Sequence, residues 1–354
     1  MSKRKIAFVG AGAVGGYTGA HMVAAGEDVT FIDPWPAHVE HMRNHGLRVT
    51  HAVKEPEFTV PVRALHVTDA QQLAKEKPID IAFVCMKSYD TAWAAMLIRQ
   101  YLAPDGFVVS LQNCMNEETI AGVVGWGKTL GCIASSITVN LPEPGHIHRG
   151  AAKHGAAHTV FRTGEVHGRI SERAQEICRL VGYSDSAKVT NNLWGERWSK
   201  LVANAMANGL SACTGLGGGD MLKNEPIRRF SMRLGSEAIR VGQALGYQLE
   251  DILHLPPETI ARAGEGDDAA THSCDEQRLK DSKHTAAEQR PSMGQDMQKG
   301  RRTEIEFLNG LVVREGEKVG LSCHANAVLT DIVKRVEKGE LKPDPLHITE
   351  LRLN

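Results

Sequence analysis

Polar side chains recur every four residues in an otherwise apolar segment of the second half of the chain. Lys200, Asn204 and Asn208 stand among Leu, Val, Ala and Met residues, and Ser211 continues the series. At about 100° per residue, the first three would lie within about 80° of one another on a helix. The row could be a solvated face, but its apolar neighbours indicate a helix covered on most sides, where polar groups need partners. An ammonium group and two carboxamides in that setting could donate a proton or hydrogen bonds to a polar ligand.

A second polar cluster follows late in the chain. It runs from Ser292 through Asp296 to Glu304, a spacing that leaves room for one short helix and a turn. Taken alone, this cluster is typical of a charged helix start with capping carboxylates.

A third group lies near the N-terminus, where glycines follow an apolar run in the pattern G-x-G-x-x-G. Gly10 would make the tight turn, Gly12 has no Cβ to block a pyrophosphate, and Gly15 would let helix and strand pack closely. Asp33 ends the next β-rich run, where a carboxylate can accept hydrogen bonds from an adenosine ribose. An ordinary glycine-rich turn is the alternative. The predicted dinucleotide site comprises Gly10, Ala11, Gly12, Ala13, Val14, Gly15 and Asp33.

Strand and helix signals alternate through the first half of the chain. Apolar runs at 79–85, 107–111 and 131–139 predict strands, and 89–99 predicts a helix. Strands that alternate with helices of about ten to fifteen residues are typical of a doubly wound parallel sheet. The predicted fold class is therefore α/β, with an N-terminal Rossmann-type sheet. Short glycine-punctuated segments at 145–161 predict antiparallel strands at the edge of that sheet.

The second half has helical periodicity. Apolar residues at 193–205 recur at three- and four-residue spacing, and 228–245 and 304–319 predict further long helices. We therefore expect a dinucleotide-binding domain at 1–188 and an all-α domain at 189–354.

Two segments of this half stand apart from the helices. Residues 263–289 form a polar insert, expected to be a solvated loop or polar helix, with a substrate-gating flap as the alternative. The stretch 342–354 is expected to be a surface tail or a dimer arm.

Composition excludes several classes of protein. A net charge of −1 gives no electrostatic footprint for nucleic acid or a membrane surface, and no apolar run is long enough to span a bilayer. The seven cysteines are an odd, scattered set without C-x-x-C, which favours reduced thiols and a cytoplasmic protein. We expect no metal site. The candidate histidines lie on glycine-broken segments without an acidic or thiolate partner, namely His146, His148, His154 and His158.

The motifs together resemble the ketopantoate reductase family. The resemblance extends in order from residue 6 to about 335, and its lysine-helix and S-M-x-Q-D…T-E-I motifs are specific to that family. The matching segments are GAGAVGGY at 10–17, MKSYDT at 86–91, LQN at 111–113, WSKLVANAMAN at 198–208, SMGQD at 292–296 and RTEI at 302–305. The resemblance implies a Rossmann domain joined to a helical domain of the 6-phosphogluconate-dehydrogenase C-terminal type. It also implies an NAD(P)-dependent oxidoreductase that interconverts a 2-oxo acid and a 2-hydroxy acid, commonly as a homodimer.

The resemblance also assigns roles to single residues. Hydride transfer to a ketone leaves negative charge on its oxygen, so a proton donor is needed there, and the resemblance implies Lys200 as general acid/base. Glu304 would hold the lysine, contact the cofactor and bind the substrate. Asn113 would lie between nicotinamide and substrate, and Lys87 would face the cofactor. Substrate binding would fall to Asn204, Asn208 and Ser292.

Three positions depart from the family's pattern. Where the family usually has an arginine for the 2′-phosphate of NADP, this chain has Asp33, which repels a phosphate dianion and suits two ribose hydroxyls. NAD(H) is therefore the expected cofactor, with NADP possible because Arg43 and His38 follow. The family's Asn-Gly is replaced by Asn113-Cys114, with Asn116 adding a polar group, and the insert at 263–289 directly precedes Ser292, where it could reshape the substrate site. Both of these departures count against ketopantoate as the substrate.

Two other functions stay open at this point. One is 2-dehydropantoate 2-reductase itself, which reduces ketopantoate to pantoate with NADPH. The other is a non-catalytic nicotinamide-binding sensor. Lys200, Asn204, Ser292 and Glu304 together count against the sensor, since a sensor needs no proton donor.

Overall fold

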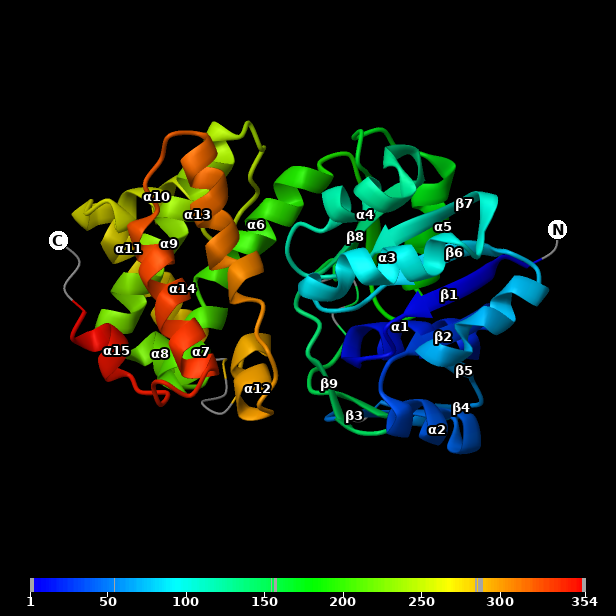
Figure 1. Cartoon of the computed structure of the whole chain (residues 1–354). Coiled ribbons are helices and arrows are strands. Elements are labelled where there is room, and N and C mark those ends of the chain that lie inside the picture. Colours follow the sequence, from blue (N-terminus) through cyan, green and yellow to red (C-terminus); the bar gives the residue numbers. More distant parts are fainter. Residues whose placement is uncertain are drawn as a thin grey trace. The chain divides into compact units, whose positions relative to one another are not determined.

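The computed structural model divides into two compact units, Met1–Leu193 and Trp194–Asn354 (Figure 1). The sequence placed the domain boundary near residue 188. The last strand of the first unit, β12 (Ala187–Thr190), pairs with β11 (Phe161–Glu165) and so belongs to the first sheet. The residues that the structure describes are 3–53, 55–153, 155, 158–283, 285 and 289–351.

An eight-stranded sheet forms the centre of the first unit, in the order β12-β11-β8-β7-β6-β1-β2-β5. The strands from β8 to β5 run parallel, whereas β11 is antiparallel to β8. The predicted doubly wound α/β sheet is thus confirmed. Its other strands are β1 (Lys5–Val9), β2 (Asp28–Asp33), β5 (Arg63–His66), β6 (Ile79–Val84), β7 (Leu102–Ser110) and β8 (Thr129–Ala134).

The central strands β1 and β6 are buried along their whole length and mostly apolar, because both faces of the sheet are covered. All five residues of β1 are buried, and the ring of Phe8 stacks on that of Phe83 with centroids 4.6 Å apart. A Cβ on Gly19 would lie 2.5 Å from the ring of Phe31, so a glycine there allows the first helix to lie close to the sheet.

Helices cover both faces of this sheet. One hydrophobic cluster includes residues of α1 and α5, and a second, on the other face, includes residues of α3 and α4. The helices are α1 (Ala13–Ala24), α2 (Pro36–His45), α3 (Thr91–Arg99), α4 (Glu117–Val124) and α5 (Glu172–Val181), with 3-10 turns η1 (Val67–Lys75), η2 (Ser88–Asp90) and η3 (Trp126–Lys128).

A second, four-stranded sheet corrects the expectation for residues 145–161. These residues were expected as antiparallel strands at the edge of the main sheet. Only β11, which begins at Phe161, joins that sheet, antiparallel to β8 and next to the edge strand β12. β10 belongs to a separate sheet, where it pairs in parallel with β3, nearly a hundred residues earlier in the chain. The strand order is β4 (Phe58–Val60), β3 (Leu47–His51), β10 (His146–Arg149) and β9 (Val139–Glu143).

The second unit is helical, as predicted. Its longest helix, α9, begins where the Asn224 side chain accepts a hydrogen bond from the Ile227 N–H at 3.2 Å, a normal N-cap. The helices are α6 (Leu193–Ala205), α7 (Asn208–Thr214), α8 (Gly218–Lys223), α9 (Glu225–Ala244), α10 (Pro257–Gly264), α11 (Asp268–Ser282), α12 (Ser292–Gln298), α13 (Asn309–Lys318), α14 (His324–Glu337) and α15 (Leu346–Thr349), with the 3-10 turn η5 (Ile305–Phe307).

The polar insert at 263–289 contains a polar helix, α11, which is one of the two forms expected for it. Asp267 caps α11 by accepting the Ala270 N–H at 2.8 Å. Ala270, Thr271 and Cys274 are buried, so one face of this polar helix packs inward.

One expectation for the helices of this unit is wrong. The helix expected at 304–319 begins only at Asn309, because residues 305–307 form a 3-10 turn. Of the stretch 342–354, expected to be a surface tail or a dimer arm, the structure describes residues 342–351. This part packs against its own unit: the Asp344 N–H donates to the Cys213 carbonyl at 2.8 Å, and Ile348 of α15 is buried.

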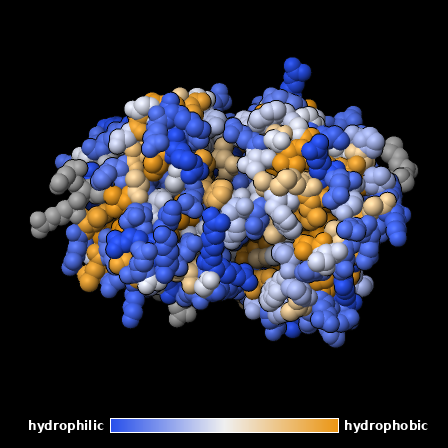
Figure 2. Space-filling model, in the orientation of Figure 1, coloured by the Kyte–Doolittle hydropathy of each residue, from blue (hydrophilic) through white to orange (hydrophobic). Residues whose placement is uncertain are grey.

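Among the described residues, no helix is long and apolar enough to cross a membrane. On the face drawn in Figure 2, hydrophobic residues lie in separate patches among hydrophilic ones.

Candidate active site

The glycine loop after β1 is shaped by two glycines that the fold itself requires. Gly10 has φ +101°, and a Cβ there would lie 2.9 Å from the sulfur of Met86. A Cβ on Gly15 would lie 2.3 Å from the Gly10 carbonyl oxygen and 2.8 Å from the Cβ of Cys85. Any side chain at either position would push the loop away from β6.

Gly12 is different from its two neighbours. It has φ −63°, which any residue can adopt, and a Cβ there would have no atom within 4 Å. The protein's own packing therefore does not demand glycine at this position. The open space lies at the start of α1, where the first N–H groups of a helix have no intrahelical acceptors and favour an anion. These features fit the pyrophosphate of a dinucleotide.

The loops that carry the other predicted cofactor residues leave the same edge of the sheet. Neighbouring strands β1, β6 and β7 are parallel, so their carboxyl ends lie together. Lys87 follows β6 and Asn113 follows β7. The chain order reverses between β1 and β6, and ligands of open α/β sheets bind outside the carboxyl ends at such a switch point.

Asn116 ties two of these loops together, a role that the sequence did not reveal. It is buried, and its Nδ2 donates to the Asn113 carbonyl at 2.7 Å and to Ser88 Oγ at 3.2 Å. The sequence analysis treated Asn116 as an added polar group near the substrate. Its observed contacts instead fix the loop after β7 to the loop after β6.

The carboxylate of Asp33 lies at the end of β2, as expected, but both its oxygens have protein partners. Oδ2 accepts the Ala11 N–H at 2.7 Å, and Oδ1 accepts the Trp35 N–H at 2.9 Å. Arg43, which follows in the sequence, donates to the Ala64 carbonyl and pairs with Asp69 at 2.5 Å.

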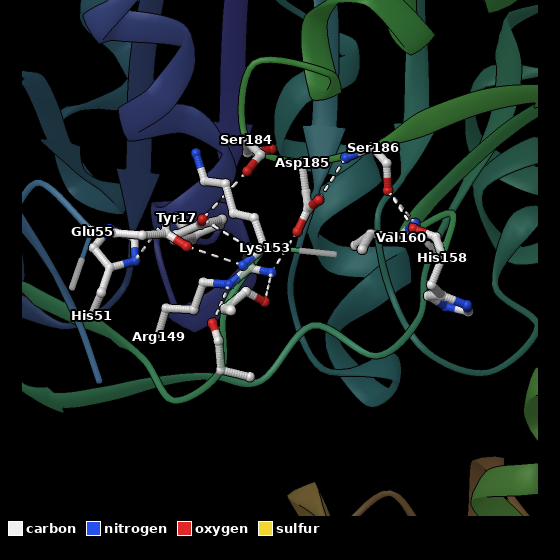
Figure 3. Close-up of polar contacts among 12 residues, drawn as sticks. Tyr17, His51, Glu55, Arg149, Lys153, His158, Val160, Ser184, Asp185 and Ser186 are labelled. Atoms are coloured by element: carbon white, nitrogen blue, oxygen red, sulfur yellow. Dashed lines mark hydrogen bonds and ion pairs between the residues drawn. The ribbon is translucent and has the colours of Figure 1, made fainter. Parts of the chain in front are cut away.

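A buried ion pair anchors α1, the helix that begins at the glycine loop (Figure 3). The guanidinium of Arg149 pairs with Asp185 and donates to the Tyr17 hydroxyl at 2.8 Å. Both charged side chains are almost wholly inaccessible to solvent, and burial raises the pKa of Tyr17 to about 12. Arg149 also donates to the carbonyls of Ala151 and Ala152. The network joins α1 to the segments before and after β11. Since the two buried charges are paired and hydrogen-bonded, neither is left uncompensated.

In the second unit, the predicted row of polar residues is not on one continuous helix. Lys200 and Asn204 lie on α6, which ends at Ala205, and Asn208 begins α7. The break is stabilised from outside the helix. The carbonyl of Ala205 accepts the Asn309 side-chain amide at 3.1 Å, and that of Met206 accepts the Ser231 hydroxyl at 2.8 Å.

The break brings Asn208 to the second polar cluster. Asn208 Nδ2 donates to Ser292 Oγ at 3.4 Å, so two of the predicted substrate residues are in contact although they are far apart in sequence. Glu304 is buried and directly precedes η5, where its carbonyl accepts the N–H groups of Phe307 and Leu308.

Within the described ranges, no group of three or more His, Cys, Asp or Glu residues could hold a metal ion, and His154 lies outside those ranges. His146 and His148 both contact the Thr50 hydroxyl. All seven cysteines are free thiols. Cys114 is buried and has φ +64°, a conformation that favours glycine.

The first unit thus has the architecture of a Rossmann-type dinucleotide-binding protein. Comparison with known proteins agrees with this class. Residues 6–158 match the family described as ketopantoate reductase PanE/ApbA, and residues 192–337 match its C-terminal domain. The chain is 31% identical to a 2-dehydropantoate 2-reductase of Archaeoglobus fulgidus, over 96% of this chain and 100% of that protein.

Solved structures share the fold over nearly the whole chain. A PanE/ApbA family ketopantoate reductase from Ralstonia eutropha JMP134 has a TM-score of 0.77 and 26% identity, covering 95% of this chain and 99% of that one. D-mandelate dehydrogenase, solved with NADH and anilino(oxo)acetate, also has a TM-score of 0.77, at 22% identity and with coverage of 95% and 99%. The chain belongs to the ketopantoate reductase family.

Proposed function

We propose that this protein is an oxidoreductase that interconverts a 2-oxo acid and a 2-hydroxy acid with a nicotinamide cofactor. The observation that carries the proposal is the space at Gly12, which the fold leaves open beside the start of α1. Membership of the ketopantoate reductase family and the 2-dehydropantoate 2-reductase activity named for the Archaeoglobus relative support it. The first unit would hold the cofactor, and residues of the second would act on the acid.

The cofactor, when bound, supplies or accepts the hydride at the substrate's second carbon. During reduction, negative charge develops on the former ketone oxygen, and the ammonium of Lys200 would donate a proton there. In the opposite direction, neutral Lys200 would take the proton from the hydroxyl group. Glu304 would hold the lysine in place and bind the cofactor.

The acid's carboxylate needs neutral hydrogen-bond donors as well as charge. The contact between Asn208 and Ser292 supports these two residues as a joint site for that group, with Asn204 four residues before Asn208, on α6. Asn113 and Lys87 would line the nicotinamide end, where Asn116 holds the loop of Asn113 against Ser88.

We further propose a preference for NAD(H). The carboxylate of Asp33 would repel a 2′-phosphate, and Arg43 is occupied by Asp69 and the Ala64 carbonyl. Each oxygen of Asp33 accepts one backbone hydrogen bond and keeps acceptor capacity for a ribose hydroxyl. We also propose that the protein is a homodimer, which sedimentation velocity would test.

Initial rates with NADH and NADPH would test this function, against ketopantoate and a panel of branched and aromatic 2-oxo acids. NADH-dependent turnover of a panel acid, with ketopantoate a poor substrate, would support the proposal. NADPH-dependent turnover of ketopantoate would instead establish the second candidate, 2-dehydropantoate 2-reductase. Binding of a cofactor without turnover of any acid would favour a sensor.

A lysine variant tests the mechanism separately. Lys200→Ala should lower kcat by at least about a hundredfold, since general acid catalysis contributes that much. Cofactor binding should persist because the glycine loop is unchanged. Unaltered turnover would show that Lys200 is not the proton donor.

A further inference from the structure

His38 of α2 is fully buried and joins two segments that are distant in sequence. Its Nε2 lies 2.9 Å from the Ala11 carbonyl oxygen in the glycine loop. Its Nδ1 accepts the Gly145 N–H, also at 2.9 Å, from the turn between β9 and β10. A single imidazole therefore connects the candidate cofactor loop to the second sheet.

The partners decide the protonation state of this ring. The Gly145 N–H can only donate, so Nδ1 must lack a hydrogen, and the Ala11 carbonyl can only accept, so Nε2 must carry one. His38 is thus neutral. Burial lowers the pKa of His38, which also favours the neutral ring. The ring of Trp35 stacks on it at 5.6 Å and covers one face.

The hydrogen bond to Ala11 determines more than one atom's position. A peptide unit is planar, so the Ala11 carbonyl and the Gly12 N–H form one rigid plane and point in opposite directions. Asp33 fixes the preceding plane in the same way, by accepting the Ala11 N–H at 2.7 Å. Asp33 at the end of β2 and His38 in α2 therefore set two successive peptide planes of the loop.

We propose that His38 is a positioning residue that aims the Gly12 N–H at the cofactor's pyrophosphate. This inference rests on the proposed nicotinamide-binding function and adds a residue to it. With the carbonyl of Ala11 held toward His38, the Gly12 N–H is directed to the opposite side of that peptide plane, next to the open space at Gly12.

The far side of His38 is held as firmly as the near side. Gly145 has φ +73°, and a Cβ there would lie 2.0 Å from the ring of His41, so the β9–β10 turn lies directly against α2. This contact restrains the imidazole from rotating away from the loop.

Two substitutions separate the ring's two hydrogen bonds. In His38→Asn, the side-chain oxygen can replace Nδ1 as acceptor for Gly145, but the shorter chain cannot reach Ala11. In His38→Gln, the amide can replace Nε2 as donor to Ala11. His45→Asn, an exposed residue of the same helix, is the matched control.

NADH binding and steady-state kinetics of the full chain would test the proposal. We expect His38→Asn to raise the Kd and KM for NADH by about tenfold, the effect of one lost hydrogen bond in a preorganised loop, with kcat at saturating NADH within about threefold of wild type. His38→Gln and His45→Asn should both stay within about threefold for all three constants. Thermal melts would show both His38 variants folded.

The outcomes are distinguishable. If both His38 variants bind NADH as tightly as the wild type, or lose affinity equally, the positioning role is wrong while the proposed function stands. If the wild-type protein binds neither NADH nor NADPH, the proposed function itself fails, and this inference fails with it.

Discussion

Gly12 offers the sharpest test of the cofactor site because it separates binding from folding. An alanine there would meet no atom within 4 Å, at a φ of −63° that alanine adopts freely. Alanine is a poorer N-cap than glycine but restricts the unfolded chain, so we expect the free energy of unfolding to change by less than about 1 kcal/mol. The added methyl group would fill the space beside the helix start, and NADH binding should weaken at least about tenfold, or about 1.4 kcal/mol.

Gly15→Ala should give the opposite result. Its Cβ would lie 2.3 Å from the Gly10 carbonyl oxygen, so the loop and β6 must separate at a cost of about 1–3 kcal/mol or more. A lower Tm should accompany any loss of binding in this variant. Gly122→Ala is the control for binding. A Cβ there would also have no atom within 4 Å, and NADH affinity should not change. Because Gly122 lies inside α4, alanine should raise the free energy of unfolding by about 0.5–1 kcal/mol.

Titration calorimetry with NADH and urea unfolding of the three variants would provide the comparison. If Gly12→Ala binds NADH with wild-type affinity, the open space does not hold the pyrophosphate and the cofactor site is wrongly placed. If it unfolds as readily as Gly15→Ala, the fold itself needs glycine at this position.

Three other predictions follow from buried polar contacts. Burial lowers the pKa of His21 to about 4, so the folded state favours the neutral ring. The free energy of unfolding is therefore unaffected by His21 above about pH 6.5, and protonation of this ring lowers it by about 3 kcal/mol as the pH falls to about 4. Urea unfolding across this pH range should therefore be less pH-dependent in His21→Asn, and an equal dependence would contradict the assignment. Asn309→Leu should cost about 1–3 kcal/mol by leaving the Ala205 carbonyl without its donor, and unchanged urea unfolding would refute this. Asp33→Ala should narrow the difference between NADH and NADPH affinity and also weaken both, since the Ala11 N–H loses its acceptor; titrations with an unaltered ratio would exclude the charge argument.

The sequence predicted those parts of the fold that depend on neighbours along the chain. The apolar run of β1, the glycine turn and the start of α1 are consecutive, so sterics and strand propensity determine them locally. The alternation of strand and helix signals, which predicted the parallel sheet, is likewise a local property of the chain. Lys200 and Asn204 were placed correctly on one helix, because the helical periodicity of 193–205 continues without interruption through both residues.

The break between α6 and α7 shows why the remainder could not be predicted. Local periodicity favours a continuous helix through Asn208, since no proline or glycine interrupts 200–208. Its carbonyls are instead satisfied by Asn309 and Ser231, which come from α13 and α9. Because these donors are distant in sequence, no local pattern signals that the helix can end here without an energetic penalty.

The contacts that support the candidate cofactor loop also come from residues distant in sequence. His38 and Gly145 are 107 residues apart, and only the parallel pairing of β10 with β3 brings the β9–β10 turn to α2. A glycine motif therefore specifies the path of the loop, while the direction of its N–H groups depends on a histidine and a turn that no motif includes. Residues of this second kind will differ among proteins that share the motif. Their substitution can change cofactor affinity without altering any residue that would touch the cofactor, since a peptide plane transmits a contact on its carbonyl to the N–H on its other side.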